Sequence, residues 1–329
     1  MRFQDIKTEC QFLAMALLMS LSACSGGGGA TTATPNTTTT TTNTTTTNAA
    51  VTSPAVTGGT TAVFAAVATP SIATTRINFF RQLVGINPVT EDAALNQTAQ
   101  NHVNYMINNN LTQLVHTETA GLISFTGASP LDRYVQVRTT PFYDAYVAES
   151  IGSYSDQYAA VDQLINSVYH QLPLLHAYTS HVGVASVATA ALDGTIIDVV
   201  KPVNTVAMPL YVYPADGYSS APIDFYGEIP DPLAGSVVVG QVAGGVMSMY
   251  APSHVLVVSS ASFTEVATGN VLVVETLDKN TDPHAILTTE SVFFIPHQKL
   301  KPLTQYQMSV QYSLDGGATL TRTWRFTTA

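Results

Sequence analysis

Residues 165–185 read "INSVYHQLPLLHAYTSHVGVA", and this stretch joins a predicted helix to a predicted β-hairpin. Downstream, "HVGVASVA" (181–188) and "GTIIDVV" (194–200) are typical of strands, and the Leu-Asp-Gly sequence between them predicts a turn. Upstream, "DQYAAVDQLINSV" (156–168) has apolar residues at helical spacing. We expect these helix side chains to point inward: Tyr158, Val161, Leu164 or Ile165, and Val168.

Three histidines, His170, His176 and His181, fall at this junction. Imidazoles so close in sequence can be metal ligands, a base with helpers, or polar residues of a buried turn. The pattern alone leaves all three alternatives open.

Two further helices are predicted earlier in the chain. The segment "RINFFRQLVGINPV" (76–89) has apolar residues at helical spacing, and its "GINP" ends the helix. The segment "AALNQTAQNHVNYMINNN" (93–110) has one apolar stripe, with His102 expected on its flank. The predicted core positions of the two helices are Ile77, Phe80 and Val84, then Leu95, Ala99, Val103 and Met106.

Composition bounds the class of protein. The 329 residues are 46% hydrophobic and only 10% charged, with a net charge of −10, which suits about two globular domains. No basic cluster suggests nucleic-acid binding.

The N-terminus resembles a bacterial lipoprotein signal. Arg2 and Lys7 precede "QFLAMALLMS" (11–20), an apolar run too short to span a bilayer. The run ends at "LSAC" (21–24), which is similar to a lipobox, although an ordinary signal peptide is the alternative. The resemblance implies that residues 1–24 are a signal peptide and that Cys24 is lipidated, with Ser25 implying the outer membrane if the cell is Gram-negative.

The lipoprotein interpretation also limits the roles that cysteine can have in the mature protein. Cleavage removes Cys10 and the lipid consumes Cys24, so thiol catalysis and cysteine-ligated zinc are excluded. Residues 25–69 are rich in Thr and Gly and contain no charged residue, which predicts a flexible tether.

Between residues 70 and 204 several motifs follow one another in the order of a known family. They are the two early helices, then "LVHTETAG", "SPLDRY", "VAESIG" and "INSVYH…YTSHVGVA". Together they resemble the bacterial branch of the CAP superfamily (SCP/PR-1-like domains) over about residues 72–200. The resemblance implies an α+β fold, an α-β-α sandwich with a cleft that holds two histidines and acidic residues.

Carried over motif by motif, the resemblance assigns His116, Glu149 and His170 to this cleft. Two imidazoles and a carboxylate can bind a divalent ion such as Zn²⁺, or the carboxylate can hold a protonated histidine. His176 and His181 are then structural or solvent-facing. Asp132 and Arg133 match a position that packs the loop carrying His116.

Departures from the family pattern weaken the case for an enzyme. Ala148 and Ser150 replace the usual neighbours of the glutamate, and no H-E-x-x-H motif is present. Ser167 lies three residues before His170, so a nucleophile pair or a helix-capping role is open.

From residue 205 onward the pattern changes to short strands separated by Gly, Asp, Asn and Pro, among them "GSVVVGQV" (235–242) and "HAILTT" (284–289). This pattern predicts a β-sandwich over 205–329. "LKPLTQYQMSVQY" resembles immunoglobulin-like and fibronectin-type-III-like domains, which implies that Tyr306 hydrogen-bonds across a corner. Trp324 and Phe326 are expected in the core. His254, His284 and His297 are expected to be isolated and solvent-facing.

These patterns favour a lipid-anchored envelope protein that binds a lipid, an envelope component or a partner protein. The alternatives are a metal-dependent hydrolase acting on peptide or cell-wall substrates through His116, Glu149 and His170, and a structural or adhesin-like surface protein with a vestigial cleft. The membrane is an expected partner through the lipid anchor, and nucleic acid is not.

Overall fold

The computed structural model describes residues 66–138, 145–202, 208–234 and 242–329. The predicted signal peptide, Cys24, the tether up to residue 65, and residues 235–241 of one predicted strand lie outside the described residues. All described residues belong to one compact unit. None of the helices in these four ranges has both the length and the apolar character needed to cross a bilayer.

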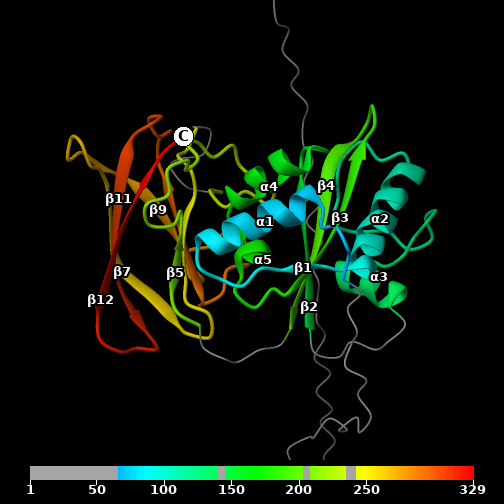
Figure 1. Cartoon of the computed structure of the whole chain (residues 1–329), viewed down its shortest axis with the longest axis horizontal. Coiled ribbons are helices and arrows are strands. Elements are labelled where there is room, and N and C mark those ends of the chain that lie inside the picture. The colour runs from blue at the N-terminus through cyan, green and yellow to red at the C-terminus, as the bar shows by residue number, and fades with distance from the viewer. Residues whose placement is uncertain (1–65, 139–144, 203–207, 235–241) are drawn as a thin grey trace, which may run out of the picture. The chain divides into compact units, whose positions relative to one another are not determined.

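The N-terminal half of the unit is a four-stranded sheet between two layers of helices (Figure 1). The strands are β1 (Thr90–Glu91), β3 (His181–Ala188), β4 (Asp193–Pro202) and β2 (Ala145–Gly152), in that order across the sheet. One layer contains α2 (Ala93–Asn108) and α3 (Pro130–Val137). The other layer contains α1 (Ile72–Leu83), α4 (Gln157–Ile165) and α5 (Gln171–Leu175).

The three predicted helices are present as α1, α2 and α4, and the predicted hairpin is present as β3 and β4. Asp92 caps α2 by accepting the amide N–H groups of Ala94 and Leu95. Strands β3 and β4 pair in antiparallel register through the predicted turn. The seven core positions predicted for the first two helices are all buried: Ile77, Phe80, Val84, Leu95, Ala99, Val103 and Met106.

The inward orientation predicted for Tyr158 is wrong. Its side chain is 48% exposed, while Val161, Leu164, Ile165 and Val168 are buried as expected. The Tyr158 ring lies 4.2 Å from the Arg76 guanidinium carbon, so a cation–π contact at the surface replaces core packing. Helices α3 and α5 were not predicted because they are short.

The C-terminal half contains two four-stranded antiparallel sheets. The first consists of β5 (Tyr211–Tyr213), β6 (Met247–Tyr250), β10 (Ser291–Pro296) and β9 (Val274–Leu277). The second consists of β12 (Leu320–Thr327), β11 (Gln305–Leu314), β7 (Leu256–Glu265) and β8 (Val271–Leu272). A shared core between the two sheets includes Trp324 and Phe326, as predicted.

The turn chemistry of this half agrees with the sequence in one place and differs in another. The backbone N–H of Lys301 donates to the Tyr306 hydroxyl at 3.0 Å, which is the predicted corner bond. The strand expected at "HAILTT" (284–289) is wrong. The Asp282 carboxylate accepts the amide N–H groups of Ile286 and Leu287 and folds this segment into a turn.

The first of these two sheets is buried on both faces. Phe293 and Ile295 of β10 pack into the core that contains α1, α4 and α5. Val292 and Phe294, which alternate with them, pack into the core shared with the second sheet. A buried amide adds a polar link, because the hydroxyls of Ser248 and Tyr250 both donate to Gln171 Oε1 of α5. The two halves of the unit are therefore joined by one continuous core.

Gly183 of β3 sets the distance between α2 and the N-terminal sheet. A Cβ atom there would lie 2.1 Å from the carbonyl carbon of Leu95 in α2. Gly183→Ala should therefore lower the free energy of unfolding by about 3 kcal/mol, because the helix must move away from the sheet. Chemical denaturation measures this change.

Gly269→Ala is the matched control. Gly269 has φ +74° and open space around its Cα, so only backbone strain of about 1 kcal/mol is expected. Equal losses of stability in the two variants would contradict close helix–sheet contact at Gly183.

Candidate functional site

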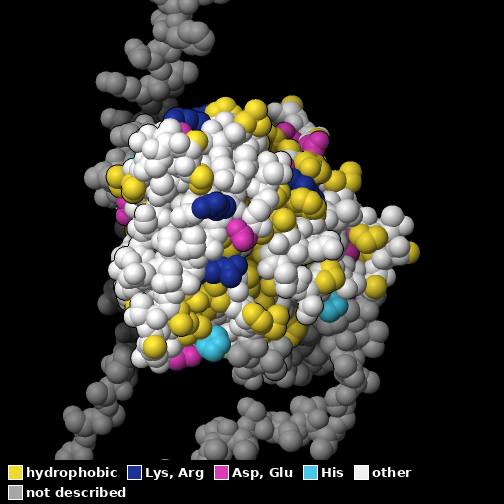
Figure 2. All heavy atoms as spheres, turned by 60° about the vertical axis from the view of Figure 1, so that its left-hand side comes forward, with side chains coloured by type: hydrophobic (Ala, Val, Ile, Leu, Met, Phe, Trp, Pro, Cys, Tyr) yellow, Lys and Arg dark blue, Asp and Glu magenta, His cyan; other side chains and the backbone are white. Residues whose placement is uncertain are grey.

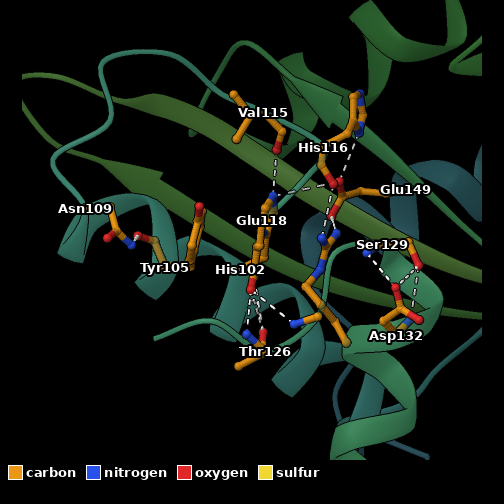
Figure 3. A network of polar contacts seen from close by, with 12 residues as sticks. His102, Tyr105, Asn109, Val115, His116, Glu118, Thr126, Ser129, Asp132 and Glu149 are labelled. Atoms are coloured by element: carbon orange, nitrogen blue, oxygen red, sulfur yellow. Dashed lines mark hydrogen bonds and ion pairs between the residues drawn. The ribbon is translucent and has the colours of Figure 1, made fainter. Parts of the chain in front are cut away.

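The loop after α2 and strand β2 bring two of the predicted cleft residues into contact. His116 Nδ1 lies 2.9 Å from Glu149 Oε1, and the Glu149 side chain is buried while that of His116 is 43% exposed. Figure 3 shows both side chains meeting beside the sheet. His116 is thus oriented by a buried carboxylate and keeps one side open to solvent.

Arg133 of α3 fixes this pair from the helix side. Its guanidinium donates to Glu149 Oε2 at 2.6 Å and to the backbone carbonyl of His116 at 3.1 Å. The predicted role of Arg133 in packing the His116 loop is confirmed. Asp132 acts differently, since its carboxylate forms a capping box with Ser129 at the start of α3.

The predicted flank position of His102 is wrong, because its side chain is completely buried within the same network. His102 Nδ1 lies 3.0 Å from Glu118 Oε1, and its Nε2 lies 2.6 Å from the carbonyl oxygen of Val115. Glu118 also accepts the backbone N–H of Thr126. These contacts tie both ends of the loop that carries His116 to α2, as Figure 3 shows.

His170 completes the pair of cleft histidines. Its ring stacks on that of His116, with 5.7 Å between ring centroids and 22° between ring planes. His170 Nδ1 lies 2.8 Å from Glu228 Oε2, a residue of the C-terminal half. The structure therefore brings His116, Glu149 and His170 together and adds Glu228, which the sequence reasoning missed.

The three predicted residues do not form a ready-made metal site. Among the described residues no group of three or more His, Cys, Asp or Glu side chains is arranged to hold an ion. Both oxygens of Glu149 are engaged by His116 and Arg133, so they support His116 and are not left free to bind an ion. Of the three predicted residues, only the Nε2 atoms of His116 and His170 are left to bind a ligand. The divalent metal stays a prediction.

Ser167 is not placed as a nucleophile. Its hydroxyl is buried and donates to the backbone carbonyl of Leu164 at 2.6 Å, at the end of α4. This bond is the capping role considered from the sequence.

The other histidines have structural partners. His176 Nε2 lies 3.1 Å from Glu290, and His181 Nδ1 lies 2.8 Å from the Ser180 hydroxyl. The expected isolation of the three C-terminal histidines is wrong, because each has a polar partner. The pairs are His254 with Asp315, His284 with the Asp231 carbonyl, and His297 with Glu275.

A second buried carboxyl group lies beside Glu149. Asp198 of β4 is the cross-strand neighbour of Glu149, and neither of its carboxyl oxygens has a hydrogen-bond partner among the described residues. Burial raises the pKa of Asp198 well above its usual range, and the negative charge of Glu149 adds to this effect. Burial opposes ionisation of Glu149 too, but the His116 hydrogen bond and the Arg133 charge outweigh it and lower the pKa of Glu149.

Two cavities adjoin the stacked histidines. The larger, about 670 Å³, is lined by residues that include Leu114, Ile151, Phe225 and Tyr226. The smaller, about 530 Å³, is mainly apolar, and its lining includes Tyr146, Val147, Leu172, Pro173 and Ile286. His116, His170 and Ile229 line both cavities. The site is thus a two-part cleft with the imidazoles at the point where its parts meet.

Comparison with known proteins identifies the segment that carries most of this cleft. Residues 74–200 match the family model of CAP, described as the cysteine-rich secretory protein family. This segment of the chain is therefore a CAP domain, as its motifs indicated. No curated protein matches the chain.

Two solved structures match parts of the chain at low similarity. An outer surface protein from Borrelia burgdorferi is 18% identical, with 43% of this chain and 99% of that chain covered and a TM-score of 0.33. The copper resistance protein PcoC from Escherichia coli is 12% identical, with 36% of this chain and 95% of that chain covered and a TM-score of 0.23. No functional conclusion rests on either likeness.

Asp198→Asn should stabilise the protein at neutral pH. The pKa of an unfolded Asp is about 3.9. A group whose pKa is raised by folding stabilises the folded state below this unfolded pKa. The stabilisation is lost as the pH rises towards the folded pKa. Asparagine is neutral throughout, so its advantage over wild type should grow as the pH rises above about 4. Thermal unfolding across this range measures the difference.

Asp193→Asn is the control for this experiment. Asp193 is exposed on the same strand, and hydrogen bonds from Ser155 lower its pKa, so its replacement should lose a little stability at neutral pH. Melting temperatures of Asp198→Asn equal to those of wild type at every pH would contradict a protonated Asp198.

Proposed function

We propose that this chain is a lipid-anchored CAP-domain protein of the bacterial envelope that binds an amphiphilic ligand in the two-part cleft. The observation that carries the proposal is the pair of cavities that meet at His116, His170 and Ile229. Cavities of this size, lined by apolar groups with a few oriented polar ones, are typical of small-molecule sites.

The chemistry of the lining supports an amphiphilic ligand. Tyr146 is 60% exposed, and Ile229 is 88% exposed, although both line the smaller cavity. When a ligand covers apolar side chains that are exposed to water beside a cavity, the free energy of the complex falls. The apolar part of the ligand would therefore lie along the smaller cavity, with its polar end at the imidazoles.

The sequence signal that ends at Cys24 supports the proposed envelope location. A lipid at this residue and the Thr-rich segment after it would hold the cleft near a membrane while leaving it free to move. We propose that the β-rich half is an immunoglobulin-like module. On the side of β7, β11 and β12 the Lys and Arg side chains lie apart from one another among mainly uncharged ones (Figure 2).

The hydrolase alternative finds less support in the geometry. The candidate nucleophile Ser167 donates its hydroxyl to the α4 backbone, and no group of three or more His, Cys, Asp or Glu side chains among the described residues is arranged to hold a metal ion. A hydrolase would show metal-dependent cleavage of peptide or cell-wall substrates that is lost in His170→Ala. A structural protein would show neither ligand nor cleavage.

Native mass spectrometry of the protein purified from its own envelope tests the binding proposal. Wild type should carry a co-purified ligand, and Tyr146→Ser should retain at least about tenfold less, the equivalent of roughly 1.4 kcal/mol. Tyr158→Ser is the matched control, since Tyr158 is also an exposed tyrosine of the CAP domain but does not line either cavity. Equal ligand in wild type and Tyr146→Ser, or none in any protein, would contradict the proposal.

A further inference from the structure

Glu228 reaches the cleft from outside the CAP domain. It belongs to the segment between β5 and β6, and its side chain is only 4% exposed. Its carboxylate accepts the backbone N–H groups of Val168, Tyr169 and His170 and also contacts His170 Nδ1. One carboxylate thus connects the C-terminal half to the backbone and the ring of the second cleft histidine.

The contact decides which nitrogen of a neutral His170 carries the proton. An ionised carboxylate can only accept hydrogen bonds, so the proton of the neutral ring must lie on Nδ1. The lone pair is then on Nε2. Glu149 imposes the same arrangement on His116. Because the two rings are stacked, the cleft brings two acceptor-bearing imidazoles together at one place.

We propose that Glu228 is a positioning residue of the ligand site, which holds Nε2 of His170 as an acceptor beside that of His116, so that the cleft selects ligands whose polar end carries hydroxyl or ammonium groups. This inference rests on the proposed binding function and names the class of ligand. It also makes the C-terminal half a part of the site rather than a neighbouring module.

The charges around the cleft agree with this selectivity. The described residues that line the larger cavity include Glu228 and Asp231 but no lysine or arginine. A carboxylate or phosphate placed there would meet acceptor nitrogens and two acidic side chains, with no cation to offset its loss of water. Lys201 lines the smaller cavity, where its Nζ lies 5.6 Å from the centre of the Tyr146 ring.

The competing explanation is that Glu228 serves only to satisfy backbone amides. Glu228→Gln separates the two roles, because glutamine has one acceptor oxygen and one NH₂ donor. If the oxygen keeps the bonds to Val168 and Tyr169, the NH₂ group faces His170 Nδ1 and favours the tautomer with the proton on Nε2.

Two-bond ¹H–¹⁵N NMR spectra of the histidine rings at about pH 8, above the ordinary histidine titration range, report the tautomer directly. Wild type should show His170 with the proton on Nδ1, and Glu228→Gln should lose this tautomer while His116 keeps it. Glu275→Gln is the matched control, because it changes a histidine–carboxylate pair at His297 that is not part of either cavity lining. A wild-type His170 with the proton on Nε2, or a tautomer unchanged in Glu228→Gln, would overturn the positioning role.

Binding of two probes with the same acyl chain tests the selectivity. Monolauroylglycerol carries a hydroxyl end and lauric acid a carboxylate end. Titration calorimetry with wild type should give an affinity at least about tenfold higher for the glycerol ester, and Glu228→Gln should lose this preference. Tighter binding of lauric acid would overturn the ligand class. Binding of neither probe would contradict the proposed function, and the tautomer would still decide the role of Glu228.

Discussion

The structure depends on a sheet that is buried on both faces. Alternate residues of β10 point to opposite sides, so Phe293 and Ile295 complete the core of the CAP domain while Val292 and Phe294 complete the core of the β-rich half. Because neither core is closed without this sheet, the two halves form one unit. The same arrangement brings the segments that carry Glu228 and Asp282 to the CAP domain, where they contact His170 and Tyr169.

Buried charge adds a second constraint, which shapes the cleft before any ligand binds. Arg133 and Glu149 are both buried and pair directly, since an isolated charge in this environment would be costly. Arg81 of α1 is buried as well, and its guanidinium donates to backbone carbonyls that include those of Leu174, His176 and Thr179. These bonds fix the loop from α5 to β3, while Glu149 fixes His116. Buried charged groups therefore fix the segments that carry the cleft residues.

Local periodicity was enough to predict α1, α2, α4 and the hairpin, because their contacts are set by residues close in sequence, and the resemblance of one motif predicted the Tyr306 corner. It failed for Tyr158, where a surface cation–π contact outweighs the apolar pattern, and for residues 284–289, where Asp282 imposes a turn. Motif order identified His116, Glu149 and His170. Motif order could not identify Glu228, because its partner His170 lies 58 positions away in the chain. It could not identify Asp198 either, because its partner Glu149 lies on a neighbouring strand.

Native-state hydrogen exchange of wild type and Phe293→Ala tests most directly whether the two halves form one unit. Phe293 lies on the face of the shared sheet that packs against the CAP helices, and its loss should cost about 3–5 kcal/mol. The slowest amides of β4 in the CAP domain and of β11 in the β-rich half should lose equal exchange free energy. A loss confined to the β-rich half, with β4 unchanged, would show two independent domains and contradict the shared core on which the cleft depends.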